Sequence, residues 1–224
     1  MSLRLKSSIM LLLLAGMGFS VIQACDAQQP IDRKAVIEEM NARELKRIPE
    51  TQILQTAEKM ADTIAEKAEK ALEEALITAI QQKGVPAALK VCNVNALPIV
   101  NKVSQEKGVK VSRVTDRPRN PMNETDSLES LILEAYQYNL EKDIVQEASI
   151  MRETDEMLRY TKPISISGGL CLNCHGQIGT EIKGDSYETI LGDYPEDQAI
   201  GYELNDLCGM WVIKLPVKEV VNAL

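Results

Sequence analysis

The chain has 224 residues, of which 45% are apolar and 26% are charged. This length allows one domain with a sizeable core, and the composition excludes a mainly disordered chain, a collagen-like repeat and a multi-span membrane protein. The formal net charge is -8. Because such an acidic surface repels phosphate, nucleic acid is not expected as a partner.

The first 24 residues have the pattern of an export signal. Arg4 and Lys6 precede an uncharged stretch over 7–24 whose apolar centre is a little short for a stable membrane span. Cys25 follows directly, as in a bacterial lipoprotein signal, where this thiol takes a lipid and becomes the mature N-terminus. The alternatives are cleavage near Ala27 by the ordinary signal peptidase, or an uncleaved anchor. We expect a periplasmic or cell-surface lipoprotein, held at the membrane through Cys25 in a compartment where disulfides form.

A tether and a short helix are expected over 25–50. Residues 26–30 are polar, and 32–46 can form a charged helix. This helix must stop before Pro49, because proline disfavours a helical conformation of the residue that precedes it. The stretch therefore separates the signal from the domain that we assign to 51–224.

Two helices are predicted next. Apolar residues recur every three or four positions over 51–83, which is typical of a long amphipathic helix, here with a narrow Ala-rich stripe. Gly84 suits the end of this helix, and Pro86 suits the first turn of the following one, which carries Cys92. The stripe can pack in a core or form the surface of a homodimer, and the sequence leaves both open.

The remaining predicted elements are two helices and a few strands. Asp126 and Glu129 are spaced as a capping box for a helix over 126–141. Strand patterns occupy 157–166, 200–204 and 210–215, the last two joined as a hairpin through Asn205-Asp206, and a short helix closes the chain over 217–224. This order predicts an α+β domain in which N-terminal helices pack on a small antiparallel sheet.

Residues 171–175 read Cys-Leu-Asn-Cys-His, which is the attachment motif of c-type haem. Cys171 and Cys174 are three residues apart, so on one helical turn their thiols can reach the two vinyl groups of one porphyrin and form thioethers. The adjacent imidazole of His175 then lies under the iron and supplies the proximal ligand. We therefore predict one covalently bound haem c.

Other uses of this motif remain open. Cys171, Cys174, His175 and one further Cys could instead bind a structural zinc ion. The protein would then be a haem-free, zinc-stapled ligand-binding lipoprotein. The two thiols could also form a plain disulfide or a redox pair of the thioredoxin type. The redox pair is less favoured, because strand-like residues and Gly168-Gly169 precede the motif where a βαβ context is required.

His175 is the only histidine, so a monomer cannot hold haem iron between two imidazoles. General chemistry favours methionine as the second axial ligand, since thioether ligation is common in electron carriers, with cysteine, lysine, water or an open position as alternatives. Cys92 lies on the apolar side of its helix, where a cysteine is more often a small core residue, and it could pair with Cys208 in a disulfide. The methionine candidates are Met40, Met60, Met122, Met151, Met157 and Met210.

Several motifs occur in a fixed order around the haem signature. They are Cys92 with Ala96 and Pro98, Arg119-Asn-Pro-Met-Asn123, Tyr160-Thr-Lys-Pro-Ile164, Cys171-Leu-Asn-Cys-His-Gly176, Tyr194-Pro-Glu-Asp197, and Gly201-Tyr202 ahead of Asp206-Leu-Cys-Gly209. Over about 51–216 the chain thereby resembles a family of single-haem c-type cytochromes with a PAS-like fold, typified by a cyanobacterial cytochrome and related to sensory haem domains of bacterial signalling proteins. The resemblance implies a PAS-like α+β domain whose second axial ligand is a cysteine thiolate on the N-terminal helix, here Cys92. Cys208 departs from the family, which usually has arginine there.

Ligation by His175 and a thiolate predicts a low haem potential, because anionic sulfur stabilises Fe(III) more than Fe(II). Loss of the thiolate on reduction would open a position for a small gas. Arg119, together with Arg117, can pair with the haem propionates. We expect an electron carrier or a redox or gas sensor that works with a redox or signalling partner protein. No enzyme motif is present, and weak peroxidase activity at the haem is the only turnover we consider.

Overall fold

The computed structural model describes residues 32–42, 48–94 and 109–224 of the chain. The chain forms two compact units, Met1–Arg47 and Ile48–Leu224. The export signal and Cys25, with its predicted lipid, lie outside the described residues.

The first unit contains the predicted charged helix as α2, Arg33–Ala42. The Asp32 side chain accepts hydrogen bonds from the backbone N–H groups of Lys34 and Ala35, which caps the first turn of this helix. No helix among the described residues is both long enough and apolar enough to cross a membrane.

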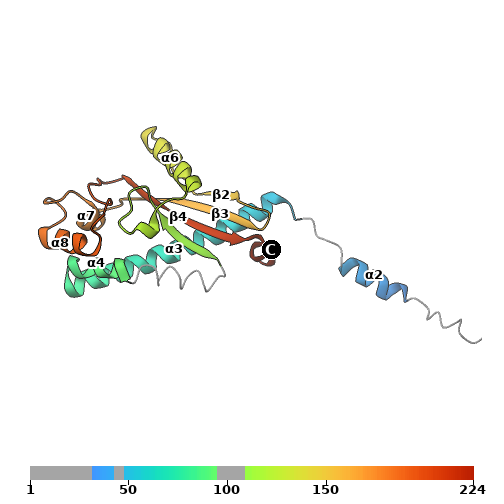
Figure 1. Cartoon of the computed structure of the whole chain (residues 1–224). Helices are drawn as coiled ribbons and strands as arrows, with labels where there is room; N and C mark the ends of the chain where they lie inside the picture. Colours follow the sequence, from blue (N-terminus) through green and yellow to red (C-terminus); the bar gives the residue numbers. More distant parts are fainter. Residues whose placement is uncertain (1–31, 43–47, 95–108) are drawn as a thin grey trace, which may run out of the picture. The chain divides into compact units, whose positions relative to one another are not determined.

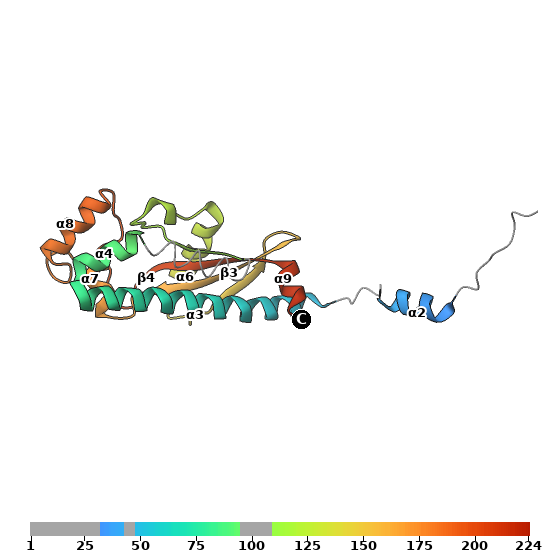
Figure 2. The same ribbon diagram turned by 90° about the horizontal axis from the view of Figure 1, so that it is seen from below.

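The second unit is an α+β domain, which confirms the predicted fold class. Its four strands form one antiparallel sheet in the order β1-β4-β3-β2. The strands are β1 Lys110–Val114, β2 Ser149–Arg152, β3 Met157–Ser165 and β4 Leu207–Pro216. The long helix α3, Glu50–Lys83, and the helix α6, Ser127–Glu141, cover opposite faces of this sheet (Figures 1 and 2). The shorter helices are α4 Val85–Val94, η1 Pro121–Asn123, α7 Gly169–His175, α8 Gly184–Asp193 and α9 Val217–Asn222.

Strand β4 shows why both faces of the sheet are covered. Trp211, Ile213 and Leu215 are buried in the cluster that includes α3. Met210 and Val212 alternate with them and are buried against side chains of α6 on the other face. A strand that is buried on both faces reads as a nearly continuous apolar run, as this one does.

The Ala-rich stripe of α3 packs in the core of the second unit. Its fully buried members are Ala57, Ala61, Ala65 and Ala68. Small side chains at these positions let the helix backbone approach the sheet closely. Beside the stripe, Asp62 accepts a hydrogen bond from the Tyr160 hydroxyl and pairs with Lys162 Nζ at 3.3 Å, so polar contacts also fix the helix on β3.

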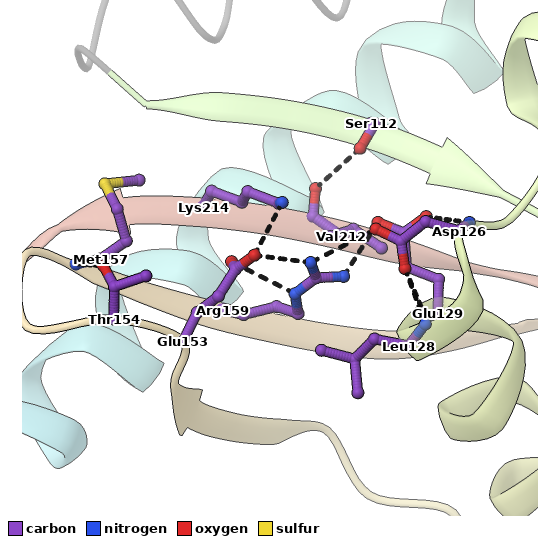
Figure 3. A network of polar contacts seen from close by, with 10 residues as sticks. All are labelled: Ser112, Asp126, Leu128, Glu129, Glu153, Thr154, Met157, Arg159, Val212 and Lys214. Atoms are coloured by element: carbon purple, nitrogen blue, oxygen red, sulfur yellow. Dashed lines mark hydrogen bonds and ion pairs between the residues drawn. The ribbon is translucent and has the colours of Figure 1, made fainter.

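The helix α6 begins with the predicted capping box. The Asp126 side chain accepts from the backbone N–H groups of Leu128 and Glu129, and the Glu129 carboxylate accepts from the Asp126 N–H at 3.0 Å. The same Glu129 carboxylate pairs with Arg159 of β3 at 3.0 Å (Figure 3). The cap therefore also fastens α6 to the sheet.

The predicted strand over 200–204, and with it the hairpin through Asn205-Asp206, is wrong. Alternating apolar residues there imitate a strand, but Gly201 and Asn205 have φ angles of 75° and 73°, which interrupt an extended backbone. The N–H groups of Gly201 and Tyr202 instead bind carbonyl oxygens at the end of α7. Strand β4 pairs with β1 and β3.

Strands β1 and β2 and helix α8 have no clear signal in the sequence. β1 has polar Ser112 and Arg113 among five residues, and β2 is a four-residue strand at the sheet edge with mostly exposed side chains. α8 begins after Lys183 without a capping side chain. Tertiary contacts, rather than local pattern, therefore define these elements.

Candidate functional site

The predicted haem motif forms the helix α7, which lies with α4 and α8 at one end of the second unit (Figures 1 and 2). Helix α4 contacts both α7 and α8. Leu89 of α4 is buried against Ile182 and Ile190. Cys92 also lies on α4, although its side chain is outside the described residues. The fold thus brings the helix of Cys92 to the helix of the motif.

Cys171 and Cys174 lie on one turn of α7, neither is in a disulfide, and both are partly buried. Cys171 packs against an apolar cluster made by Ile166, Ala199 and Tyr202. Cys174 packs against the separate cluster between α4 and α8. The two thiols therefore have the helical spacing that attachment to one porphyrin requires, with apolar surroundings on both sides.

The imidazole of His175 is held in one tautomer. Its Nδ1–H donates a hydrogen bond to the backbone carbonyl of Ala199 at 2.8 Å, which leaves the lone pair on Nε2. Burial first, and then the positive charge of Arg119, lower the pKa of His175 to about 4. At neutral pH the ring is therefore uncharged, which is the form that binds a metal.

The low pKa of His175 predicts an acid-sensitive stability of the chain without cofactor. Below about pH 6.5 His175 of the unfolded chain binds a proton, whereas in the folded chain its ring stays uncharged down to about pH 4. The free energy of unfolding therefore falls as the pH falls through this window. The expected loss is at most about 3 kcal/mol, since one pKa unit corresponds to about 1.4 kcal/mol. Urea unfolding between pH 7 and pH 4.5 measures it, with the variant His175→Gln as control. A variant with the same pH slope as the wild type would contradict the prediction.

A loop over 197–202 holds the end of α7. The Tyr202 N–H donates to the carbonyl of His175 at 2.9 Å, and the Gly201 N–H donates to the carbonyl of Gly176 at 2.8 Å. The Tyr202 ring meets the His175 ring edge-on, with 6.2 Å between the centroids. Together with the Ala199 carbonyl, these contacts fix both the backbone and the ring of His175.

Arg119 joins the motif to this loop. Its Nη2 donates to the Cys174 carbonyl at 2.6 Å, to the Ala199 carbonyl at 3.1 Å and to the Asp197 carboxylate at 3.0 Å. Only 10% of the Arg119 side chain and 2% of the Asp197 side chain are exposed. The buried Nε of Arg119 has no hydrogen-bond partner among the described residues. Pairing of Arg119 with a haem propionate stays a prediction.

Arg117 supports the same loop from its exposed side. Its Nε donates to the Gln198 carbonyl at 3.2 Å, and its Nη2 donates to the Ile200 carbonyl. The guanidinium lies over the Tyr202 ring, 4.1 Å from the centroid. Two arginines from one short segment thus bind the loop, and only Arg119 reaches the carbonyl that His175 uses.

Cys208 packs on the same apolar cluster as Cys171. Burial, and the neighbouring Cys171, raise the pKa of the Cys208 thiol to about 11. It is therefore a neutral thiol, and its Sγ donates to the Ile164 carbonyl at 3.3 Å. The disulfide between Cys92 and Cys208 that the sequence left open involves a side chain outside the described residues. Within the described part of the chain, no three His, Cys, Asp or Glu side chains are gathered as a metal-ion site.

Comparisons with known proteins decide the family. A model of the Tll0287-like family matches residues 41–216. The chain belongs to the Tll0287-like family. The crystal structure of the cyanobacterial haem protein Tll0287 has a TM-score of 0.50 and 22% sequence identity to this chain, and the match covers 71% of this chain and 95% of that one. A comparison with curated proteins gave no match.

Membership of the Tll0287-like family confirms the family resemblance of the sequence motifs, and the structural match confirms the α+β fold. At 22% identity the structural match establishes the fold alone.

The sequence singled out the candidate side chains Cys171, Cys174 and His175 but not the residues that support them. Ala199 and Tyr202 contact His175, and Asp197 pairs with Arg119, but none of the three carries a chemical signature of its own. Ala199 acts through a backbone carbonyl, which any residue has. The order of motifs around 194–202 was the only available signal, and it gave no role to any one residue.

Proposed function

We propose that this chain is an exported c-type haem protein that carries single electrons, with one haem attached through Cys171 and Cys174 and with His175 as an axial ligand. The observation that carries the proposal is the neutral His175 ring, whose Nδ1–H is bonded and whose lone pair is on Nε2, directly after two cysteines on one helical turn that are in no disulfide. Membership of a family whose namesake is a haem protein supports it.

Each residue of the site has a distinct task in this proposal. A bound haem supplies a one-electron Fe(III)/Fe(II) couple. Cys171 and Cys174 would tie the porphyrin to α7, while His175 would ligate iron through Nε2. The Ala199 carbonyl and the Tyr202 ring keep the imidazole from rotating. The apolar clusters around the two thiols would exclude water from the porphyrin face.

Cys92 is our proposed second axial ligand. It lies on α4, which contacts the helix α7 that carries His175. A thiolate there would favour Fe(III) and give a lower potential than a methionine would. We propose no substrate turnover, because the only imidazole of the chain would hold the cofactor.

The test of the second ligand compares Cys92→Ala with Cys208→Ala. Both proteins are matured in a host with haem-attachment machinery, and their optical spectra are recorded oxidised and dithionite-reduced. We expect Cys92→Ala to lose the thiolate signature of the oxidised haem, whereas Cys208→Ala keeps the wild-type spectrum. If Cys92→Ala also keeps it, a methionine or water is the second ligand.

The test of the electron-carrier role uses carbon monoxide. A carrier keeps both axial ligands through a redox cycle, so the spectrum of the reduced wild type should not change when the gas is added. A carrier also requires a redox partner protein. We propose that lipid-modified Cys25 holds this chain at the membrane and that the partner meets it there. A spectrum that changes with carbon monoxide would replace the carrier by a redox or gas sensor.

A further inference from the structure

The carbonyl oxygen of Ala199 accepts two hydrogen bonds. His175 Nδ1 donates at 2.8 Å, and Arg119 Nη2 donates at 3.1 Å. The Arg119 side chain is nine-tenths buried, and its partner Asp197 is almost completely buried. A buried ion pair therefore lies one carbonyl away from the ring of the proposed axial ligand.

We infer that Arg119 is a positioning residue, which acts on His175 through the shared Ala199 carbonyl and thereby raises the haem potential. The inference rests on the proposed function, because the potential can depend on Arg119 in this way only if His175 ligates the iron. In this role Arg119 acts on the Nδ1 side of the His175 ring, and the effect does not require contact between Arg119 and a haem propionate.

The reason lies in the competition of two donors for one acceptor. When Arg119 draws electron density from the Ala199 oxygen, the bond from the His175 Nδ1–H becomes weaker. A weaker bond at Nδ1 leaves Nε2 less electron-rich. Since an electron-rich ligand stabilises Fe(III), this favours Fe(II) and raises the potential. The positive charge of Arg119 acts in the same direction.

Asp197 offsets part of this effect. One of its carboxylate oxygens pairs with Arg119, and the other accepts from the Ala199 N–H at 2.8 Å. Loss of Arg119 leaves this carboxylate buried without its cation, which lowers the potential further. Loss of the Asp197 charge leaves the cation uncompensated and raises the potential. The two single changes therefore have opposite signs.

Arg117 is the matched control. It is an arginine of the same segment, and it also binds the 197–202 loop through two backbone carbonyls, those of Gln198 and Ile200. Neither of these acceptors is the Ala199 oxygen. A variant at Arg117 thus reports what a general loosening of the loop does.

The first measurement is the midpoint potential of the haem-loaded, full-length protein. We expect a shift to more negative potential in Arg119→Gln, a shift to more positive potential in Asp197→Asn, and a smaller shift in the double variant, in which the charges are removed together. Arg117→Gln should stay close to the wild type. Equal shifts in Arg119→Gln and Arg117→Gln would overturn the inference.

The second measurement observes the hydrogen bond itself. His175 is the only histidine, so in uniformly ¹⁵N-labelled protein without a histidine tag its Nδ1–H signal is unambiguous. In the reduced, diamagnetic low-spin protein, we expect this proton to move downfield in Arg119→Gln, because Ala199 then accepts from His175 alone. Arg117→Gln should leave it in place. An unmoved signal in Arg119→Gln would show that the shared carbonyl does not couple the two residues.

The outcomes separate this inference from the proposed function. If the wild type attaches no haem, the proposed function is wrong, and the same Nδ1–H comparison on the haem-free chain decides whether Arg119 weakens the His175 bond. If haem is attached but the potential ignores Arg119, only the inference fails. Should Arg119→Gln not fold, the near-isosteric Asp197→Asn still tests it, because an unchanged potential there contradicts the inference.

Discussion

Replacement of Arg159 by methionine is expected to lower the free energy of unfolding by about 3–5 kcal/mol, the usual cost of removing one partner from a buried ion pair. Only 2% of the Arg159 side chain is exposed. Its guanidinium pairs with Glu129 at 3.0 Å, Glu153 at 2.7 Å and Asp126 at 3.5 Å, and Lys214 joins through Glu153 (Figure 3). Methionine fills similar space but leaves the buried Glu129 without its cation.

Urea unfolding of the two proteins measures this loss, and Arg152→Met is the matched control. Arg152 forms an equally short pair with Glu50, 2.6 Å between Nη2 and Oε2, but 31% and 50% of these side chains are exposed. An exposed pair contributes at most about 1 kcal/mol. An equal loss in both variants would mean that the contribution of Arg159 to the free energy of unfolding does not depend on its burial.

The double change Cys171→Ser and Cys174→Ser is expected to abolish covalent haem attachment. Serine cannot form thioethers, while the hydrogen bond that orients His175 involves neither side chain. Any haem retained by the variant should therefore be held only through its iron ligands, without a covalent bond, and should be removed by acidic organic solvent. The measurement is the haem content of the polypeptide before and after extraction.

Cys208→Ser is the control for this change, because it also removes a partly buried thiol near the motif. It should keep its haem through extraction as the wild type does. Haem that stays on the double serine variant after extraction would contradict attachment at these two positions. Loss of haem from Cys208→Ser would point to Cys208 as an attachment site.

The sequence was most informative where local pattern decides structure. The long helix α3 and the capped helix α6 were predicted closely, since an apolar stripe and a capping box depend on neighbouring residues. The burial of Arg159 could not be predicted, because the pattern of one strand does not show which of its faces are covered. Arg159 lies on the face of the sheet opposite α3, and α6 covers that face. The irregular segment over 200–204 imitated a strand, since its backbone bonds are made to α7.

The site divides in the same way. Cys171, Cys174 and His175 are adjacent in sequence, so their shared helical turn follows from spacing alone. The acceptor for His175 is a backbone carbonyl 24 residues away, which has no side-chain signature. The approach of α4, with Cys92, to α7 is likewise a tertiary contact, which only the family resemblance anticipated.

Covalent attachment of haem can be tested by the intact mass of the purified full-length protein. The protein is produced in a host with haem-attachment machinery and extracted with acidic organic solvent. Its intact mass and its pyridine haemochrome spectrum are then recorded. We expect one haem to remain on the polypeptide and the haemochrome spectrum to be that of a c-type haem. A colourless protein, or a chain that carries zinc and no haem, would contradict it.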